Sequence, residues 1–224
     1  MIKLIIFDWD DVFVVGAKEG YLACYRKAME DYGIYIDDKT LKKITRDMWG
    51  QPGHTIIEKL IGPDNTDLLP NVVKNYRQYK RGETFLGQLR FIPNGNTFLK
   101  EISQKYLLAI ATSQERAVLH DYIFPKFKVA DVFNAIFSSH DFQDPKLAKP
   151  NPYMINQLLK KFHLKASEAV MVGDAENDVR MAQAAGVEPI VVLTGHLKKE
   201  EADKLGVKYI IPDVTKLETI LTTL

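Results

Sequence analysis

The chain has 224 residues, of which 46% are hydrophobic and 26% charged, and its 30 basic and 29 acidic side chains leave a formal net charge of +1. This composition excludes general disorder, and the charge balance argues against a nucleic-acid backbone as the main partner. With one cysteine, no Cys/His cluster and no apolar stretch long enough to span a bilayer, we expect a cytoplasmic protein without disulfides, zinc or a membrane partner.

The first predicted strand is Lys3–Phe7, and the next one comes only at Leu107–Ala111. The interval between them is far longer than the single helix of an ordinary strand-to-strand crossover. Most of it has helical periodicity, in four segments at residues 21–32, 38–50, 54–61 and 69–79. Asp38 is expected to cap the second of these helices. We therefore predict a helical subdomain, residues 16–86, inserted into a domain made of residues 1–15 and 87–224.

After the insertion, short apolar runs alternate with helical patterns. The predicted helices are Thr97–Gln104, Glu115–Tyr122, Pro152–Phe162 and Asp178–Ala185. Beyond Leu107–Ala111, the predicted strands are Ala135–Phe137, Ala169–Val172 and Pro189–Leu193, with a candidate sixth at Tyr209–Ile211. Continuous apolar runs are typical of parallel strands covered on both faces. The fold class is therefore α/β, a mostly parallel sheet with helices on both faces and an inserted all-helical subdomain.

Polar groups follow four of these strands, at the edge where ligands of parallel sheets collect. They are Asp8-Trp9-Asp10-Asp11, Thr112-Ser113-Gln114, Lys149-Pro150-Asn151-Pro152 and Gly173-Asp174-Ala175-Glu176-Asn177-Asp178. Carboxylates gathered in one cleft repel one another, so they persist only with a cation or a shared proton. Mg²⁺ prefers oxygen ligands, and a lysine and a hydroxyl-bearing turn beside it favour Mg²⁺-assisted phosphoryl transfer, in which a carboxylate can be the nucleophile.

The ordered set of motifs resembles the haloacid dehalogenase superfamily of aspartate-nucleophile hydrolases, in its phosphatase-like branch with a helical type 1 cap. The matching residues are Phe7-Asp8-Trp9-Asp10, Ala111-Thr112-Ser113, Lys149-Pro150-Asn151-Pro152, and Gly173-Asp174 with Asp178. The inserted helices stand where that cap stands, and the resemblance spans essentially the whole chain. It implies a Rossmann-like core domain that carries the cap.

The resemblance also implies catalytic roles. Asp8 would attack phosphorus and form an aspartyl-phosphate, and Asp10 would protonate the leaving oxygen and then activate water. Thr112 and the backbone N–H groups at Ser113 would hold the phosphoryl oxygens. Lys149 would bind the transferring phosphate and screen it from Asp8.

A metal site is implied by the same resemblance. Mg²⁺ would be bound by the carboxylates of Asp8 and Asp174 and by the main-chain carbonyl of Asp10. Asp178 would orient a metal-bound water. Asn177, in the same loop, is a candidate N-cap for the helix that follows.

Asp10 favours hydrolysis of a phosphate ester, because a leaving alkoxide needs a proton and the dehalogenases have no carboxylate at this place. The leading hypothesis is thus a Mg²⁺-dependent phosphatase, a phosphoric monoester hydrolase for a small phosphorylated metabolite such as phosphoglycolate or a sugar phosphate. A phosphomutase of the β-phosphoglucomutase type is an alternative, although the first helix of the insertion offers no histidine for it. Substrate identity and oligomeric state stay open.

A non-catalytic phosphate-binding protein is the third hypothesis. It is motivated by Asp11 and Val12, which stand where many relatives have Gly and then Thr or Val. Asp tolerates a positive φ better than most residues, so we expect the turn to be kept. In the insertion, the aromatic residues Tyr21, Tyr25, Trp49 and Tyr79 are interpreted as core rather than as the lining of a substrate pocket, and Cys24 as a buried, inert thiol.

Overall fold

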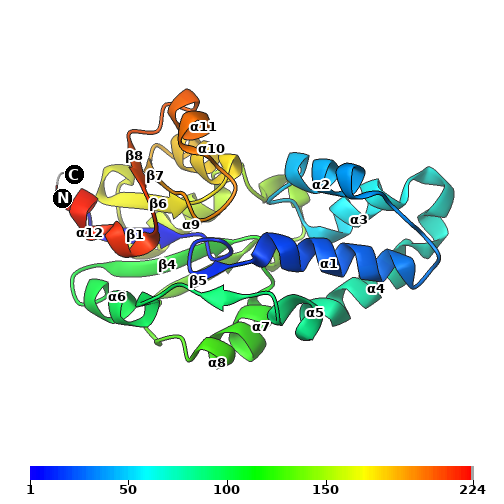
Figure 1. The fold of residues 1–224 in the computed structure, drawn as a ribbon. Coiled ribbons are helices and arrows are strands. Elements are labelled where there is room, and N and C mark those ends of the chain that lie inside the picture. The colour runs from blue at the N-terminus through cyan, green and yellow to red at the C-terminus, as the bar shows by residue number, and fades with distance from the viewer. Residues whose placement is uncertain (223–224) are drawn as a thin grey trace. The chain divides into compact units, whose positions relative to one another are not determined.

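The computed structural model describes residues 1–222 and divides into two compact units. The first, here called the sheet unit, consists of Met1–Val15 together with the chain from Phe91 onward. The second, here called the helical unit, is Gly16–Arg90. Figure 1 labels the elements of both units. No helix among the described residues is long and apolar enough to cross a bilayer.

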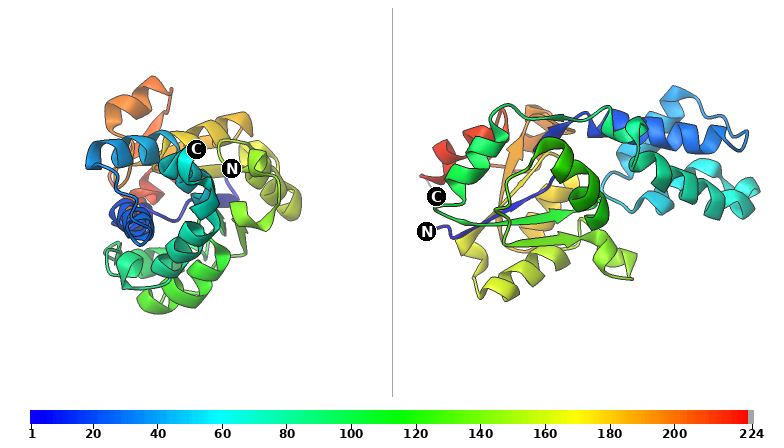
Figure 2. Two further views of the ribbon diagram at one scale, coloured as in Figure 1. Left: turned by 90° about the vertical axis from the view of Figure 1, so that its right-hand side faces the viewer. Right: turned by 90° about the horizontal axis from the view of Figure 1, so that it is seen from below.

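The sheet unit contains six parallel strands in the order β5-β4-β1-β6-β7-β8. Their bounds are β1 Leu4–Phe7, β4 Leu107–Thr112, β5 Ala135–Ser138, β6 Ala169–Gly173, β7 Glu188–Val192 and β8 Tyr209–Ile211. Helices lie around this sheet (Figure 2), which confirms the predicted Rossmann-like α/β class and the six predicted strands. Two further strands, β2 Val14–Val15 and β3 Arg90–Phe91, form a small separate sheet.

The centre of the sheet is apolar because its strands are covered on both faces. Every residue of β1 and β6 is buried. Leu4 and Ile6 of β1 pack with Met154 and Ile155 of one helix and with Met181 of another. Burial on this scale accounts for the uninterrupted apolar runs in the sequence.

The helices of the sheet unit lie largely where the sequence predicted them. Their bounds are α6 Gly95–Ile102, α7 Arg116–Val118, α8 Phe124–Phe127, α9 Tyr153–Phe162, α10 Glu176–Ala184, α11 Lys199–Lys204 and α12 Glu218–Leu221. The prediction of one regular helix over Glu115–Tyr122 is wrong in part, because a π-helical turn, Leu119–Ile123, separates α7 from α8. The spacing of apolar residues does not reveal this turn, because the same residues can be buried in an α-helix or in a π-helical turn, whose hydrogen bonds join residues four and five positions apart respectively.

The helical unit contains five α-helices and a 3₁₀ helix. They are α1 Ala17–Glu30, α2 Asp38–Asp47, α3 Gly53–Ile61, the 3₁₀ helix Pro63–Leu68, α4 Leu69–Lys80 and α5 Glu83–Leu86. The N-cap of α2 is Asp37, whose side chain accepts hydrogen bonds from the backbone of Lys39 and Thr40, so the assignment of that cap to Asp38 is wrong. Adjacent aspartates cannot be distinguished by sequence, whereas the extended backbone of Asp37 decides the cap.

Aromatic packing holds the helical unit together. The rings of Tyr25 and Tyr76 stack with centroids 4.7 Å apart, and the ring of Tyr21 contacts that of Phe85 at 4.8 Å. Cys24 is buried beside them, and burial raises the pKa of its thiol to about 12. Tyr21, Tyr25 and Cys24 are buried as predicted, whereas Trp49 and Tyr79 are only partly buried, so the core interpretation of the aromatic residues is wrong in part.

Gly20 permits the contact between α1 and α5. A Cβ atom at this position would lie 2.7 Å from Cδ2 of Phe85. We therefore expect Gly20→Ala to lower the free energy of unfolding by about 1–3 kcal/mol through overpacking, although alanine is the better helix former. Urea denaturation followed by circular dichroism measures the change. Adding Phe85→Leu should recover part of the loss, and a Gly20→Ala protein more stable than wild type would contradict the packing argument.

Candidate active site

Three of the predicted site residues meet in one buried ion-pair system. Nζ of Lys149 lies 2.9 Å from Oδ1 of Asp8, which directly follows β1, and 2.7 Å from Oδ1 of Asp178, which lies in α10. All three side chains are buried. Burial by itself lowers the pKa of Lys149, but the charges of Asp178 and Asp8 outweigh it and raise that pKa above its ordinary value. Lys149 is therefore a permanent cation at the carboxyl edge of the sheet.

Asp174 follows β6 and is held by the loop that follows β7. The backbone N–H of His196 donates to Oδ2 of Asp174 at 2.9 Å, and that of Leu197 donates to its main-chain carbonyl at 2.9 Å. Gly195 makes this approach possible, because a Cβ atom there would lie 1.9 Å from Oδ2 of Asp174. The side chain of Asp174 is thus fixed by a loop that none of the sequence motifs included.

Asp178 makes hydrogen bonds to the backbone, in addition to the water-orienting role that the resemblance implies. Besides its ion pair with Lys149, its Oδ2 accepts hydrogen bonds from the backbone N–H groups of Asp174 and Ala175, at 3.3 and 3.2 Å. It therefore satisfies donors at the start of α10, and the candidate assignment of Asn177 as the N-cap is wrong, because Asn177 already lies within the helix.

The donor set fits a divalent cation that prefers oxygen. Asp8, Asp174 and Asp178 each offer a carboxylate oxygen, and the three atoms lie within 4.8 Å of one another. Oδ1 of Asp174 is buried and has no hydrogen-bond partner in the described part of the chain. Burial, followed by the charges of Asp178, Asp8 and Asp11, raises the pKa of Asp174 well above its ordinary value. A bound cation would supply the charge that these carboxylates lack.

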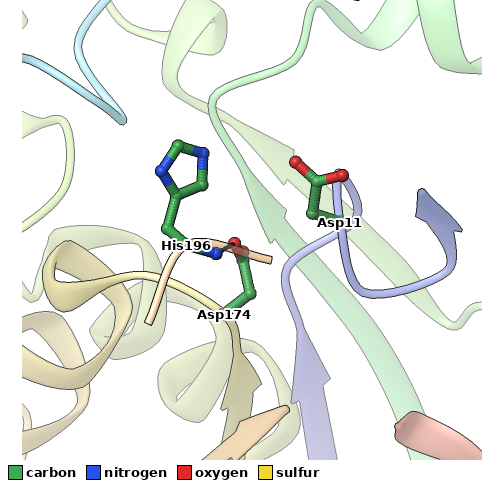
Figure 3. A group of neighbouring side chains, drawn as sticks. All are labelled: Asp11, Asp174 and His196. Carbon is green, nitrogen blue, oxygen red and sulfur yellow. Dashed lines mark hydrogen bonds between the residues drawn. The ribbon is translucent and has the colours of Figure 1, made fainter. Parts of the chain in front are cut away.

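A second group of donors shares Asp174. Figure 3 shows the side chains of Asp11 and His196 beside it, coming from the loops after β1 and β7. One ligand atom from each of the three residues lies within 4.8 Å of the others. His196 is not among the predicted site residues, although it follows the predicted strand Pro189–Leu193 as the other polar groups follow their strands.

Asp11 adopts the backbone conformation that glycine usually supplies. Its φ is +57°, its N–H donates to the carbonyl of Val14 at 2.7 Å, and its own carbonyl accepts a hydrogen bond from Oγ1 of Thr194 at 2.6 Å. The turn is therefore kept with an aspartate in the left-handed region, as expected. Two residues earlier, Trp9 is buried between the rings of Phe13 and Phe124, at centroid distances of 5.2 and 4.9 Å, so its side chain packs in the core.

The phosphate-binding turn implied by the resemblance follows β4. The backbone N–H of Gln114 donates to Oγ1 of Thr112 at 3.1 Å, and Oγ of Ser138 donates to the carbonyl of Gln114 at 2.6 Å. Ser113 lies between these anchored residues. The side-chain amide of Gln114 reaches Oδ2 of Asp10 at 3.3 Å, a contact that the sequence did not predict.

The conformation of Asp11 leads to a stability prediction. Asp11→Asn should change the free energy of unfolding little, because asparagine accepts positive φ, whereas Asp11→Val should lower it by about 1–2 kcal/mol. Urea denaturation of the two variants beside wild type measures the difference. Equal stability of Asp11→Val and Asp11→Asn would show that the backbone does not hold this conformation in solution.

The raised carboxyl pKa values predict how a metal changes stability with pH. Burial raises the pKa of Asp178 to about 6, against the opposing charge of Lys149, and raises that of Asp174 as well. Without metal, the folded state binds more protons than the unfolded one above about pH 4, so these groups contribute less stability as the pH rises through their folded pKa values. A cation favours the ionised carboxylates, so its stabilising effect should grow over the same range.

We expect Mg²⁺ at about 100 times its Kd to raise the melting temperature by about 5 °C at pH 7.5, and by less than half as much at pH 5. Thermal denaturation with Mg²⁺ and with chelator measures both values. Asp174→Asn is the control and should remove most of the shift. A shift that is independent of pH would contradict a metal site built on these carboxylates.

Comparison with known proteins agrees with this geometry. Residues 5–192 match the family model of haloacid dehalogenase-like hydrolases. The chain is 26% identical over 205 residues to phosphoglycolate phosphatase of Aliivibrio fischeri, which covers 87% of this chain and 86% of that protein. It is 25% identical over 234 residues to glyceraldehyde 3-phosphate phosphatase of Methanocaldococcus jannaschii, which covers 100% of this chain and 99% of that protein.

A solved structure shares the fold over the same extent. It is a haloacid dehalogenase-like family hydrolase of Streptococcus pneumoniae, with a TM-score of 0.76 and 21% identity, covering 100% of this chain and 99% of that chain. Residues 5–192, which match the family model, contain all the carboxylates of the site, from Asp8 after β1 to Asp178 in α10. The predicted resemblance is therefore confirmed, and this chain belongs to the haloacid dehalogenase-like hydrolase family.

Proposed function

We propose that this chain is a Mg²⁺-dependent phosphatase that hydrolyses a small phosphorylated metabolite through an aspartyl-phosphate on Asp8. The observation that carries the proposal is the buried ion pair between Asp8 and Lys149, with Asp174 and Thr112 at the same edge of the sheet. The phosphatase names of the relatives from Aliivibrio fischeri and Methanocaldococcus jannaschii support the reaction class.

Asp8 is suited to be the nucleophile because its backbone is anchored to the sheet and its side chain has a fixed ionic partner. Its backbone N–H donates to the carbonyl of Val172 in the neighbouring strand at 2.9 Å, so the residue continues the line of β1. Nζ of Lys149 lies 2.9 Å from Oδ1, so the carboxylate has a cation beside it. The same ammonium group would neutralise charge on a phosphoryl group held at Asp8.

The reaction runs in two displacements. In the first, a carboxylate oxygen of Asp8 forms a bond to phosphorus while the bond to the ester oxygen breaks, and Asp10 gives that oxygen a proton. In the second, Asp10 takes a proton from water as the water attacks phosphorus, which releases inorganic phosphate and restores the carboxylate of Asp8. Thr112 and the N–H groups at Ser113 would hold the phosphoryl oxygens during both steps.

Mg²⁺ would be held by the carboxylates of Asp8 and Asp174 and by the main-chain carbonyl of Asp10, and when bound it supplies charge stabilisation for the phosphoryl group. Hydrogen bonds from the backbone hold the residues of this site in position. His196 and Leu197 fix Asp174 through their backbone N–H groups.

We assign substrate choice to the helical unit, residues 16–90, as its cap function. The substrates to test are phosphoglycolate, triose phosphates and sugar phosphates, because the two relatives are named as phosphatases of phosphoglycolate and of glyceraldehyde 3-phosphate. The non-catalytic alternative loses its main motivation, since Asp11 keeps the turn that a glycine would make.

Activity on phosphoglycolate and 4-nitrophenyl phosphate tests the proposal. With Mg²⁺, the wild type should release phosphate, and Asp8→Asn should reduce kcat by at least about 1000-fold, because no carboxylate then attacks phosphorus. Excess chelator should also abolish turnover. The exposed Asp131→Asn is the control and should behave as wild type.

The intermediate and the products are measured in the same experiment. Hydroxylamine should trap an acyl phosphate on the wild type but not on Asp8→Asn, and ³¹P NMR should show inorganic phosphate as the only phosphorus product. A phosphorylated isomer of the substrate would indicate a mutase. Turnover by Asp8→Asn at the wild-type rate would refute the assigned nucleophile.

A further inference from the structure

We propose that Gln114 is a positioning residue that orients Asp10 for proton transfer. The inference rests on the proposed phosphatase function and adds a residue to it. Nε2 of Gln114 donates a hydrogen bond to Oδ2 of Asp10 at 3.3 Å. Both side chains are buried, with exposed fractions of 1% and 7%. Gln114 therefore places a buried amide beside the residue to which proton transfer is assigned, although it is not part of the motifs that carry the family resemblance.

The orientation of the amide is fixed by its surroundings. Oε1 of Gln114 accepts a hydrogen bond from the backbone N–H of Glu115 at 3.1 Å. Because a backbone N–H can only donate, the oxygen must face Glu115 and the NH₂ group must face Asp10. The contact with Asp10 is therefore a donated hydrogen bond rather than an arbitrary choice between two amide orientations.

The backbone of Gln114 is anchored as firmly as its side chain. Its N–H donates to Oγ1 of Thr112 at 3.1 Å, and its carbonyl accepts from Oγ of Ser138 at 2.6 Å. Thr112 ends β4 and Ser138 ends β5, and the two residues are partners in the pairing of these strands. Gln114 thus connects the rigid end of the sheet to the carboxylate of Asp10 in a different loop.

The donated hydrogen bond has a chemical consequence for Asp10. A carbonyl or carboxylate oxygen accepts a hydrogen bond better than a hydroxyl oxygen does, so the bond favours the arrangement in which Oδ2 carries no proton. The proton exchanged with the leaving oxygen or with water is then carried by Oδ1. By holding Oδ2, Gln114 also limits rotation of the carboxyl group, and a fixed donor atom is what general acid catalysis requires.

The dependence on the leaving group tests this role. The glycolate of phosphoglycolate leaves through an alkoxide oxygen that needs a proton, whereas the 4-nitrophenolate of 4-nitrophenyl phosphate leaves without one. We expect Gln114→Met, which keeps the length but has no donor, to lower kcat/KM for phosphoglycolate by about 10- to 100-fold, a part of what general acid catalysis supplies. The loss for 4-nitrophenyl phosphate should be less than about threefold.

Two further variants make the test specific. Asp10→Asn should show the same leaving-group selectivity, and Gln114→Met should add little to it in the double variant, because both changes remove one function. Gln143→Met, at an exposed glutamine, should leave both activities unchanged. Circular dichroism and the melting temperature verify that Gln114→Met folds, and Gln114→Ala serves as a second variant if it does not.

The outcomes separate the two proposals. If wild type hydrolyses both substrates and Gln114→Met loses both equally, or neither, the positioning role is refuted while the phosphatase stands. If wild type hydrolyses neither substrate, the proposed function fails and the role of Gln114 fails with it. A selective loss for phosphoglycolate that disappears in the Asp10→Asn background confirms the inference.

Discussion

The ion pairs of Lys149 with Asp8 and Asp178 are the interaction on which the rest of the site depends. A buried carboxylate is costly unless a counter-charge lies close to it, and here one ammonium group lies within 2.9 Å of two carboxylates. Asp174 adds a third buried carboxyl group whose pKa is raised. The site therefore combines one built-in cation with an excess of negative charge, which is the condition for binding a divalent cation.

The sheet makes this arrangement rigid. Parallel strands end at one edge, so residues far apart in the sequence reach one place without long loops. Backbone donors then fix each group, as the N–H of His196 does for Asp174 and that of Gln114 does for Oγ1 of Thr112. Such preorganisation matters for phosphoryl transfer, in which the protein contributes mainly positioning and charge.

Much of the fold could be predicted from sequence, because burial on both faces leaves uninterrupted apolar runs. The six strands follow from these runs, and most helices follow from apolar residues spaced three or four apart. The π-helical turn at Leu119–Ile123 does not, since the burial of its residues is compatible with either helix type. The cap of α2 was assigned one residue late for a similar reason: Asp37 and Asp38 have the same chemistry, and only the backbone distinguishes them.

The sequence alone determined the family, the parallel sheet and the set of acidic and basic residues that follow its strands, because strand-end motifs are local and occur in a fixed order. Only the tertiary structure decided how these residues are held. The hydrogen bond of His196 to Asp174 and that of Gln114 to Asp10 join residues 22 and 104 positions apart in the chain. No local pattern records such contacts, because their distances are set by strand order and loop packing.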